Sequence, residues 1–240
     1  MNDRYDMATG RTRADVDEGL RDYMNGIYAR MAGGVLITAV MAFAVGTTPA
    51  LFKMLMGGPQ AYLFIFAPVL VQWFGFRPER MKESQLQGAF FLISALYGIS
   101  FSSIAFMATA NPAMIYDVAR AFFITVSMFA GLSLYGYTTK RDLSGMSQFI
   151  FMAILGVFVM GIINLFVQSS GFSILISLIA IAAFSGLTVW ETQQLKQMYM
   201  ANRHASSLGR MAWAGAYTLY LSFIALFMHI LNLLMASNRN

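Results

Sequence analysis

Residues 186–199 read GLTVWETQQLKQMY and place one carboxylate, Glu191, at the end of an almost uncharged run. A titratable side chain at membrane depth is costly, which makes it a candidate functional group. Burial favours the neutral carboxyl, so Glu191 can act as a proton switch. When ionised, it can bind a hard cation such as calcium, although one carboxylate makes only a weak site. Lys196 lies about 7 Å further along a helix, so the alternative is an acid at the headgroup interface.

Two further polar residues lie within apolar segments. His229 follows Ser222 by seven residues, which puts both on nearly the same face of a helix. We interpret His229 as a neutral, hydrogen-bonded histidine near the outer interface, with a proton relay as the alternative. Asn164 is predicted to make a hydrogen bond between helices.

Enzyme and cofactor chemistry find no support in the sequence. The chain has 0 Cys and 2 His, so a disulfide framework and a Cys-bound metal are excluded, and a zinc or haem site is not expected. The motifs G-x-S-x-G, H-E-x-x-H and GxxxxGK[ST] do not occur, nor does an intramembrane aspartate pair. We therefore predict a protein that is not an enzyme and needs no cofactor.

The elements that must position these side chains are long apolar segments. Of 240 residues, 58% are hydrophobic and 11% are charged, whereas soluble domains have roughly 25% charged residues. A helix needs about 20 residues to cross the hydrocarbon core. The sequence predicts an all-α integral membrane protein with seven membrane-spanning helices, at residues 31–52, 60–76, 86–110, 119–137, 146–168, 172–190 and beyond, and 211–235.

The distribution of basic residues predicts the orientation. Thirteen of the 16 Lys and Arg residues lie in the first thirty residues or in the loops after the second, fourth and sixth blocks. The positive-inside rule then puts the N-terminus in the cytosol, the C-terminus outside, and Glu191 towards the cytosolic end of its helix. Residues 1–30 are predicted to form a polar cytosolic tail that ends in a short amphipathic helix, and residues 31–240 the membrane domain.

The net charge of +5 raises the question of a nucleic-acid partner. The charges lie in short clusters between apolar blocks, which is typical of loops at a membrane surface. Basic loops of this kind favour anionic lipid headgroups. We therefore predict the lipid bilayer as a partner and no nucleic acid.

Five stretches in the same order resemble the Bax inhibitor family, also called the transmembrane Bax-inhibitor-motif proteins, in its bacterial branch. They are spread over nearly the whole chain: VDEGLRDYMNGIYARMAGGVLITA, YGISFSSIAF, ARAFFITVSMFAGLSLYGYTTKRDLSGMSQFIFMAILG, FSGLTVWETQQLKQMY and YTLYLSFIALF. The resemblance implies seven helices with the last one central, in the bacterial cytoplasmic (inner) membrane. It also implies a pH-sensitive calcium leak, and bacterial relatives are linked to modulation of a membrane-bound protease.

The resemblance also implies a proton sensor. Members of the family carry an acid on helix 6 and another on helix 7, and an arginine after helix 2 latches onto the pair. Here Glu191 takes the first position and Ser222 replaces the second acid, while Arg80 is the best match for the arginine, with Arg77 as the alternative. Since the second carboxylate is missing, the pH latch is expected to be weakened or moved, and calcium binding to be weaker.

Two functions follow from this reading. The first is a channel-like protein that passes calcium or protons, with Glu191, Ser222 and Arg80 as the gate. The second is a non-conducting membrane protein that binds and modulates another membrane protein, such as a membrane-bound protease. A third reading is a divergent copy that has lost conduction.

Overall fold

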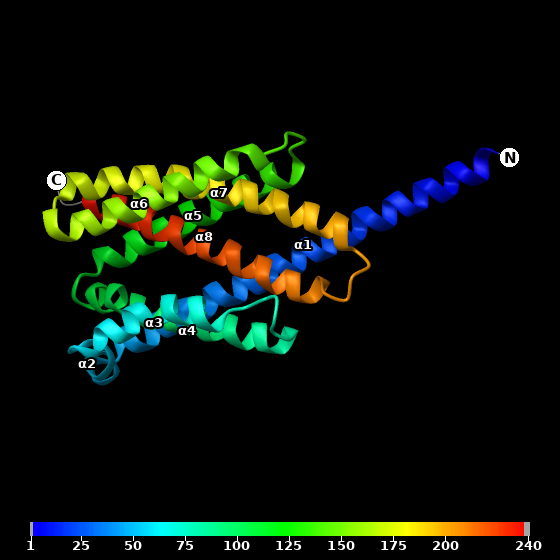
Figure 1. The fold of residues 1–240 in the computed structure, drawn as a ribbon. Helices are drawn as coiled ribbons and strands as arrows, with labels where there is room; N and C mark the ends of the chain where they lie inside the picture. Colours follow the sequence, from blue (N-terminus) through cyan, green and yellow to red (C-terminus); the bar gives the residue numbers. More distant parts are fainter. Residues whose placement is uncertain (1, 238–240) are drawn as a thin grey trace.

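The computed structural model describes residues 2–237 of the chain, and the side chains of residues 17–237. This part of the chain is entirely helical apart from its turns (Figure 1). Its elements are α1 (Asn2–Thr47), α2 (Pro49–Met56), α3 (Gln60–Gly75), α4 (Glu83–Ala110), α5 (Ala113–Thr138), the 3-10 turn η1 (Ser144–Met146), α6 (Ser147–Val167), α7 (Ser170–Asn202) and α8 (Leu208–Ser237).

The predicted membrane protein is confirmed, with one span built differently from the prediction. Six helices are long and apolar enough to cross a membrane, and the count reaches seven if α2 and α3 together form one span. These two helices are bent by 78° at the short break between them. α3 has 16 residues, fewer than the roughly 20 that a straight span needs.

The predicted end of the first span at residue 52 is wrong. α1 ends at Thr47 and α2 begins at Pro49. Thr48 between them is extended, with φ −104° and ψ 100°. A residue before proline is driven out of the helical region, whereas proline itself fits the first turn of a helix. Pro49 therefore ends one helix and begins the next.

The last helix is central, as the family resemblance implies. α8 packs against α1, α4, α5 and α7, whereas α3 packs mainly on α4 and α6 on α7. In a membrane, helices associate by close packing at small residues. Gly98 of α4 is such a point, because a Cβ atom there would lie 2.6 Å from the Thr38 carbonyl oxygen of α1.

The N-terminal segment is continuous with the first span. α1 begins at Asn2, and its first residues project beyond the bundle (Figure 1). Leu20, Tyr23, Met24 and Ile27 of the same helix are buried in the main core cluster. The apolar residues of the predicted tail thus extend the α1 packing surface by about two turns.

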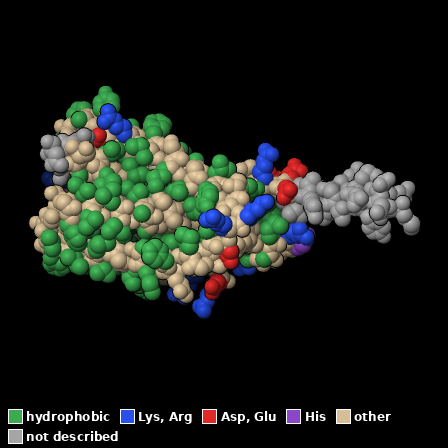
Figure 2. Space-filling model, turned by 90° about the horizontal axis from the view of Figure 1, so that it is seen from above, with side chains coloured by type: hydrophobic (Ala, Val, Ile, Leu, Met, Phe, Trp, Pro, Cys, Tyr) green, Lys and Arg blue, Asp and Glu red, His purple; other side chains and the backbone are tan. Residues whose placement is uncertain are grey.

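Charges lie at the ends of the molecule. Figure 2 shows hydrophobic side chains along the body, with most Lys, Arg, Asp and Glu side chains near the end from which α1 projects. The loops α3–α4, α5–α6 and α7–α8 lie at that end (Figure 1). We call it the basic end and the opposite one the outer end.

Candidate functional site

The candidate site is a contact between α7 and α8 near the basic end. The Ser222 hydroxyl of α8 donates a hydrogen bond of 2.7 Å to Glu191 Oε2 of α7. Ser222 is 1% exposed and Glu191 is 9% exposed. The structure therefore brings together the two residues that the family resemblance pairs.

Close packing of α5 against α7 supports this contact. Gly136 of α5 lets α5 and α7 approach each other, since a Cβ atom at this position would lie 2.5 Å from the Val189 carbonyl oxygen. Thr192 is fully buried and donates a hydrogen bond to the Thr188 carbonyl. Side chains on the flanks of Glu191 thus hold α7 against α5, while Glu191 itself faces α8.

Two residues after Glu191, α7 holds the loop between α5 and α6. Gln193 Nε2 donates to the Arg141 carbonyl at 2.7 Å, and Gln193 Oε1 accepts from the Leu143 amide at 3.0 Å. Lys196 Nζ donates to the Tyr137 carbonyl at 2.8 Å. A displacement of α7 at Glu191 would therefore also displace the loop between α5 and α6.

Arg80 is not brought to Glu191. It lies exposed in the loop between α3 and α4, as does Arg77. Among residues 17–237 the one ion pair joins Arg30 and Glu83 at 3.8 Å. Glu191 therefore has a hydroxyl partner and no charged partner in this part of the chain, and a latch by Arg80 stays a prediction.

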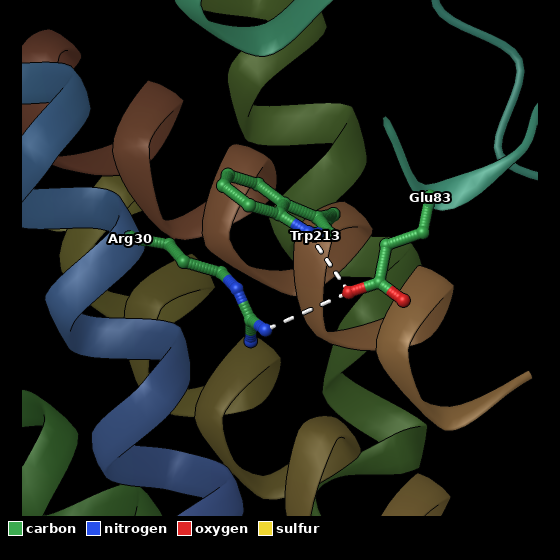
Figure 3. A network of polar contacts seen from close by, with 3 residues as sticks. All are labelled: Arg30, Glu83 and Trp213. Carbon is green, nitrogen blue, oxygen red and sulfur yellow. Dashed lines mark hydrogen bonds and ion pairs between the residues drawn. The ribbon is translucent and has the colours of Figure 1, made fainter. Parts of the chain in front are cut away.

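The ion pair belongs to a network that sequence reasoning missed (Figure 3). Trp213 Nε1 of α8 donates to Glu83 Oε1 at 3.2 Å, and the Arg30 guanidinium lies 4.8 Å from the centre of the Trp213 ring. The figure shows the Arg30 and Trp213 side chains converging on the Glu83 carboxylate. The network ties α1, the beginning of α4 and α8 together at the basic end.

We call the contact surface between α7 and α8 the α7–α8 seam. Its outer half is also polar. His229 Nδ1 lies 3.4 Å from Ser177 Oγ, and Asn232 Nδ2 donates to Ser173 Oγ at 3.1 Å. Beside them is a hollow of about 700 Å³, which we call the outer hollow; it is lined by Asn164, Gln168, Ser169, Ser170, Ser173, Asn232 and apolar residues of α4, α7 and α8. Both His229 and Ser222 thus face α7, as their spacing predicts.

The hydrogen bond of the Asn164 side chain is local and differs from the predicted bond between helices. Its side-chain oxygen accepts from the Ser169 amide at 3.2 Å. Gln168 between them is left-handed, with φ 50°. A turn this short leaves amides without helical partners, and the Asn164 side chain satisfies one of them.

Two buried polar groups lacked a clear signal in the sequence. Asp117 is 7% exposed in the second turn of α5. The Tyr220 hydroxyl of α8 lies 2.8 Å from Thr38 Oγ1, which also donates to the Ser94 carbonyl of α4. The position of Asp117 five residues after Pro112 was the available signal, because acids favour the beginning of a helix.

The residues described offer no group of three or more His, Asp or Glu side chains that could hold a metal ion. For calcium, Glu191 supplies one carboxylate and Ser222 one hydroxyl. Calcium takes six to eight oxygen ligands, so water would have to supply most of them. The two side chains alone would therefore make a weak calcium site.

Comparison with known proteins decides the family. Residues 20–240 match the family model described as "Inhibitor of apoptosis-promoting Bax1". The chain belongs to the Bax inhibitor family. It is 35% identical to inner membrane protein YbhL of Escherichia coli over 219 residues, which cover 90% of this chain and 92% of YbhL.

Two other Bax inhibitor relatives are similar over most of their length. An uncharacterised protein of Rickettsia prowazekii is 35% identical over 91% of both chains. An uncharacterised protein of Caulobacter vibrioides is 35% identical over 97% of this chain and 96% of its own. The similarity to these relatives therefore extends over nearly the whole chain.

Proposed function

We propose that this chain is a pH-sensitive calcium leak of the inner membrane and not an enzyme, with its N-terminus in the cytosol. Glu191 is its gate and Ser222 the partner of that gate. Family membership supports the class of function, and the name of YbhL supports the inner membrane. The single observation that carries the gate is the buried 2.7 Å bond between Ser222 and Glu191 across the α7–α8 seam.

The seam supplies two polar regions with an apolar layer between them. From the outer hollow, polar groups continue to Ser177 and His229. Phe184 then stacks on His229, with ring centres 6.2 Å apart, and packs against buried residues. Beyond it, the Thr188 hydroxyl bonds within α7 and offers no link to Glu191. This arrangement is the closed state of the proposed path.

Ionisation of Glu191 is the proposed opening step. The groups that face α7 around this site are uncharged: Tyr28 of α1, Ser133 of α5 and Ser222 of α8. Lys196, on α7 itself, donates a hydrogen bond to the Tyr137 carbonyl. A buried carboxylate with one hydroxyl partner is costly, so water or a cation must enter to solvate it. We therefore expect the leak to increase as pH rises.

Calcium flux into liposomes between pH 6 and 8 tests this proposal. Wild type should show a flux that rises with pH, and Glu191→Gln should lose the pH dependence while the protein still folds. Ser222→Asp restores a second carboxylate and should increase the flux. Glu79→Gln, which alters an exposed loop acid, is the control. An unchanged pH profile in Glu191→Gln would rule out the gate.

A second candidate is a non-conducting regulator that binds another membrane protein, such as a membrane-bound protease. The observation in its favour is the first part of α1, which projects beyond the bundle at the basic end (Figure 1). Removal of residues 1–16 leaves the buried residues from Leu20 onwards in place. A regulator would lose its effect in this truncation and keep it in Glu191→Gln, whereas a channel would show the reverse.

A further inference from the structure

α1 and α5 leave a groove between them on the side of the bundle. Both helices pack on α8, yet they barely touch each other. The space between them has a volume of about 790 Å³, within the roughly 300–1,000 Å³ that is typical of small-molecule sites. Phe129 and Phe223 form part of its buried wall, and Leu36 and Leu134 are each 64% exposed beside it. The groove therefore opens towards the lipid.

The wall of this α1–α5 groove changes character along its length. Arg21 and Asn25, one turn apart on α1, line the end nearest the basic end of the molecule. Tyr28 follows, and further along α1 the lining residues are apolar as far as Ala39. One charged end and a long apolar body match the shape of an amphiphile.

The depth of these residues agrees with a lipid. Counting back from Thr47, a hydrocarbon core of about 20 helical residues ends close to Tyr28. Arg21 lies seven residues earlier, about 10 Å further along the helix axis. This puts Arg21 at the level of the headgroups and the apolar lining at the level of the acyl chains.

The charge at the polar end is available to an anion. Among residues 17–237, the ion pair of Arg30 with Glu83 is the one that forms, so Arg21 has none. The neighbouring acids of α1, Asp17, Glu18 and Asp22, do not line the groove. Lys196 adds a second cation nearby, with its ammonium 5.3 Å from the ring centre of Tyr137, a residue of the groove wall.

We propose that the α1–α5 groove binds one anionic phospholipid from the leaflet at the basic end. Its acyl chain lies along Val35, Ala39 and Val126, and its phosphate pairs with Arg21. A helix of a second copy would fill the apolar part equally well, but it would leave Arg21 without an anion. The charge at the groove end thus favours a lipid over a protein occupant.

Native mass spectrometry of the full chain, offered equal amounts of phosphatidylglycerol and phosphatidylcholine, tests the headgroup contact. Wild type should retain one lipid and prefer phosphatidylglycerol. Arg21→Gln should lower phosphatidylglycerol retention about fivefold, the effect of one basic side chain beside anionic lipid. Arg77→Gln, an exposed arginine at the same end but outside the groove, should change nothing. Equal retention of both lipids by wild type, or no change in Arg21→Gln, would overturn the proposal.

Two further variants test the groove itself. Ala130→Trp fills it and should abolish retention of both lipids, whereas Ala182→Trp, at an exposed alanine of α7 outside the groove, should not. Equal thermal unfolding of the two variants excludes misfolding as the cause. Because the chain has 0 Cys, Leu36→Cys carries a unique thiol. Its oxidation to a disulfide-linked dimer in liposomes would assign the groove to a second copy and overturn the lipid.

Discussion

The two halves of the α7–α8 seam solve the problem of polar groups in a membrane in different ways. At the basic end, Glu191 and Ser222 are buried, and α5 presses against α7 at Gly136. At the outer end, Ser173 and Asn232 border the outer hollow, where water can reach them. The tight half holds a group that can change its charge, and the open half holds only neutral amides and hydroxyls besides His229.

This difference shows what each half can contribute. In a dry, close-packed setting, ionising a side chain costs free energy, and either the helices must move or water must enter to compensate. In an open setting, the same change would be absorbed by solvent with little effect on the helices. A gate is therefore expected at Glu191, and an entrance or vestibule at the outer hollow.

The largest expected effect tests the packing of the two halves. Gly136→Val would put side-chain atoms onto the Val189 carbonyl and Thr192, so we expect a loss of about 3 kcal/mol in the free energy of unfolding. Gly171→Val is the matched change at the outer end, where no atom lies within 4 Å of the added Cβ. It should change stability by less than about 0.5 kcal/mol. Unfolding in mixed detergent micelles measures both, and equal losses would remove the contrast.

The next effect tests the hydrogen bonds. Ser222→Ala removes the donor to a buried carboxylate and should cost about 2 kcal/mol, since a buried acceptor is left unsatisfied. Ser173→Ala removes the acceptor of Asn232 beside the outer hollow, where water can replace it. Its cost should stay below about 0.5 kcal/mol. If Ser222→Ala were as stable as Ser173→Ala, water would have to reach Glu191 and replace the lost hydrogen bond.

Much of this organisation could be predicted from the sequence. Apolar blocks of about 20 residues predict spans directly, because a membrane helix satisfies its own backbone. The spacing of Ser222 and His229 predicted that they share a face, and the family pattern paired Ser222 with Glu191. The bend between α2 and α3 was missed, although Gly57, Gly58 and Pro59 at the break were a visible signal for it.

Other features of the structure depend on contacts between residues far apart in the sequence, which no local sequence pattern predicts. Arg30 and Glu83 come from α1 and α4, and both contact Trp213 of α8, so the network forms only where these three helices meet. The α1–α5 groove exists because two helices that share α8 as a neighbour diverge from each other. Such features arise from the three-dimensional packing of distant segments, so no short stretch of the sequence predicts them.

The smallest expected effect compares the turns at the two ends. At the basic end, Asp142 Oδ1 accepts the Ser144 amide at 2.9 Å, and the backbone and hydroxyl of Ser144 hold the pKa of Asp142 below its ordinary 3.8. The turn is therefore stabilised above that value, and this stabilisation is lost as pH falls through the lowered pKa. At the outer end, Asn164 makes the corresponding bond to the Ser169 amide through an uncharged side chain.

Amide exchange between pH 6 and 2, corrected for the intrinsic rate at each pH, measures both turns. The protection of the Ser144 amide should fall at the acid end, whereas that of the Ser169 amide should stay constant. Asp142→Asn keeps an acceptor oxygen that does not titrate, so it should make the two turns behave alike. If Ser144 kept its protection in wild type at pH 2, the turn at the basic end would owe nothing to the charge of Asp142. The contrast between the two ends would then be confined to the buried seam.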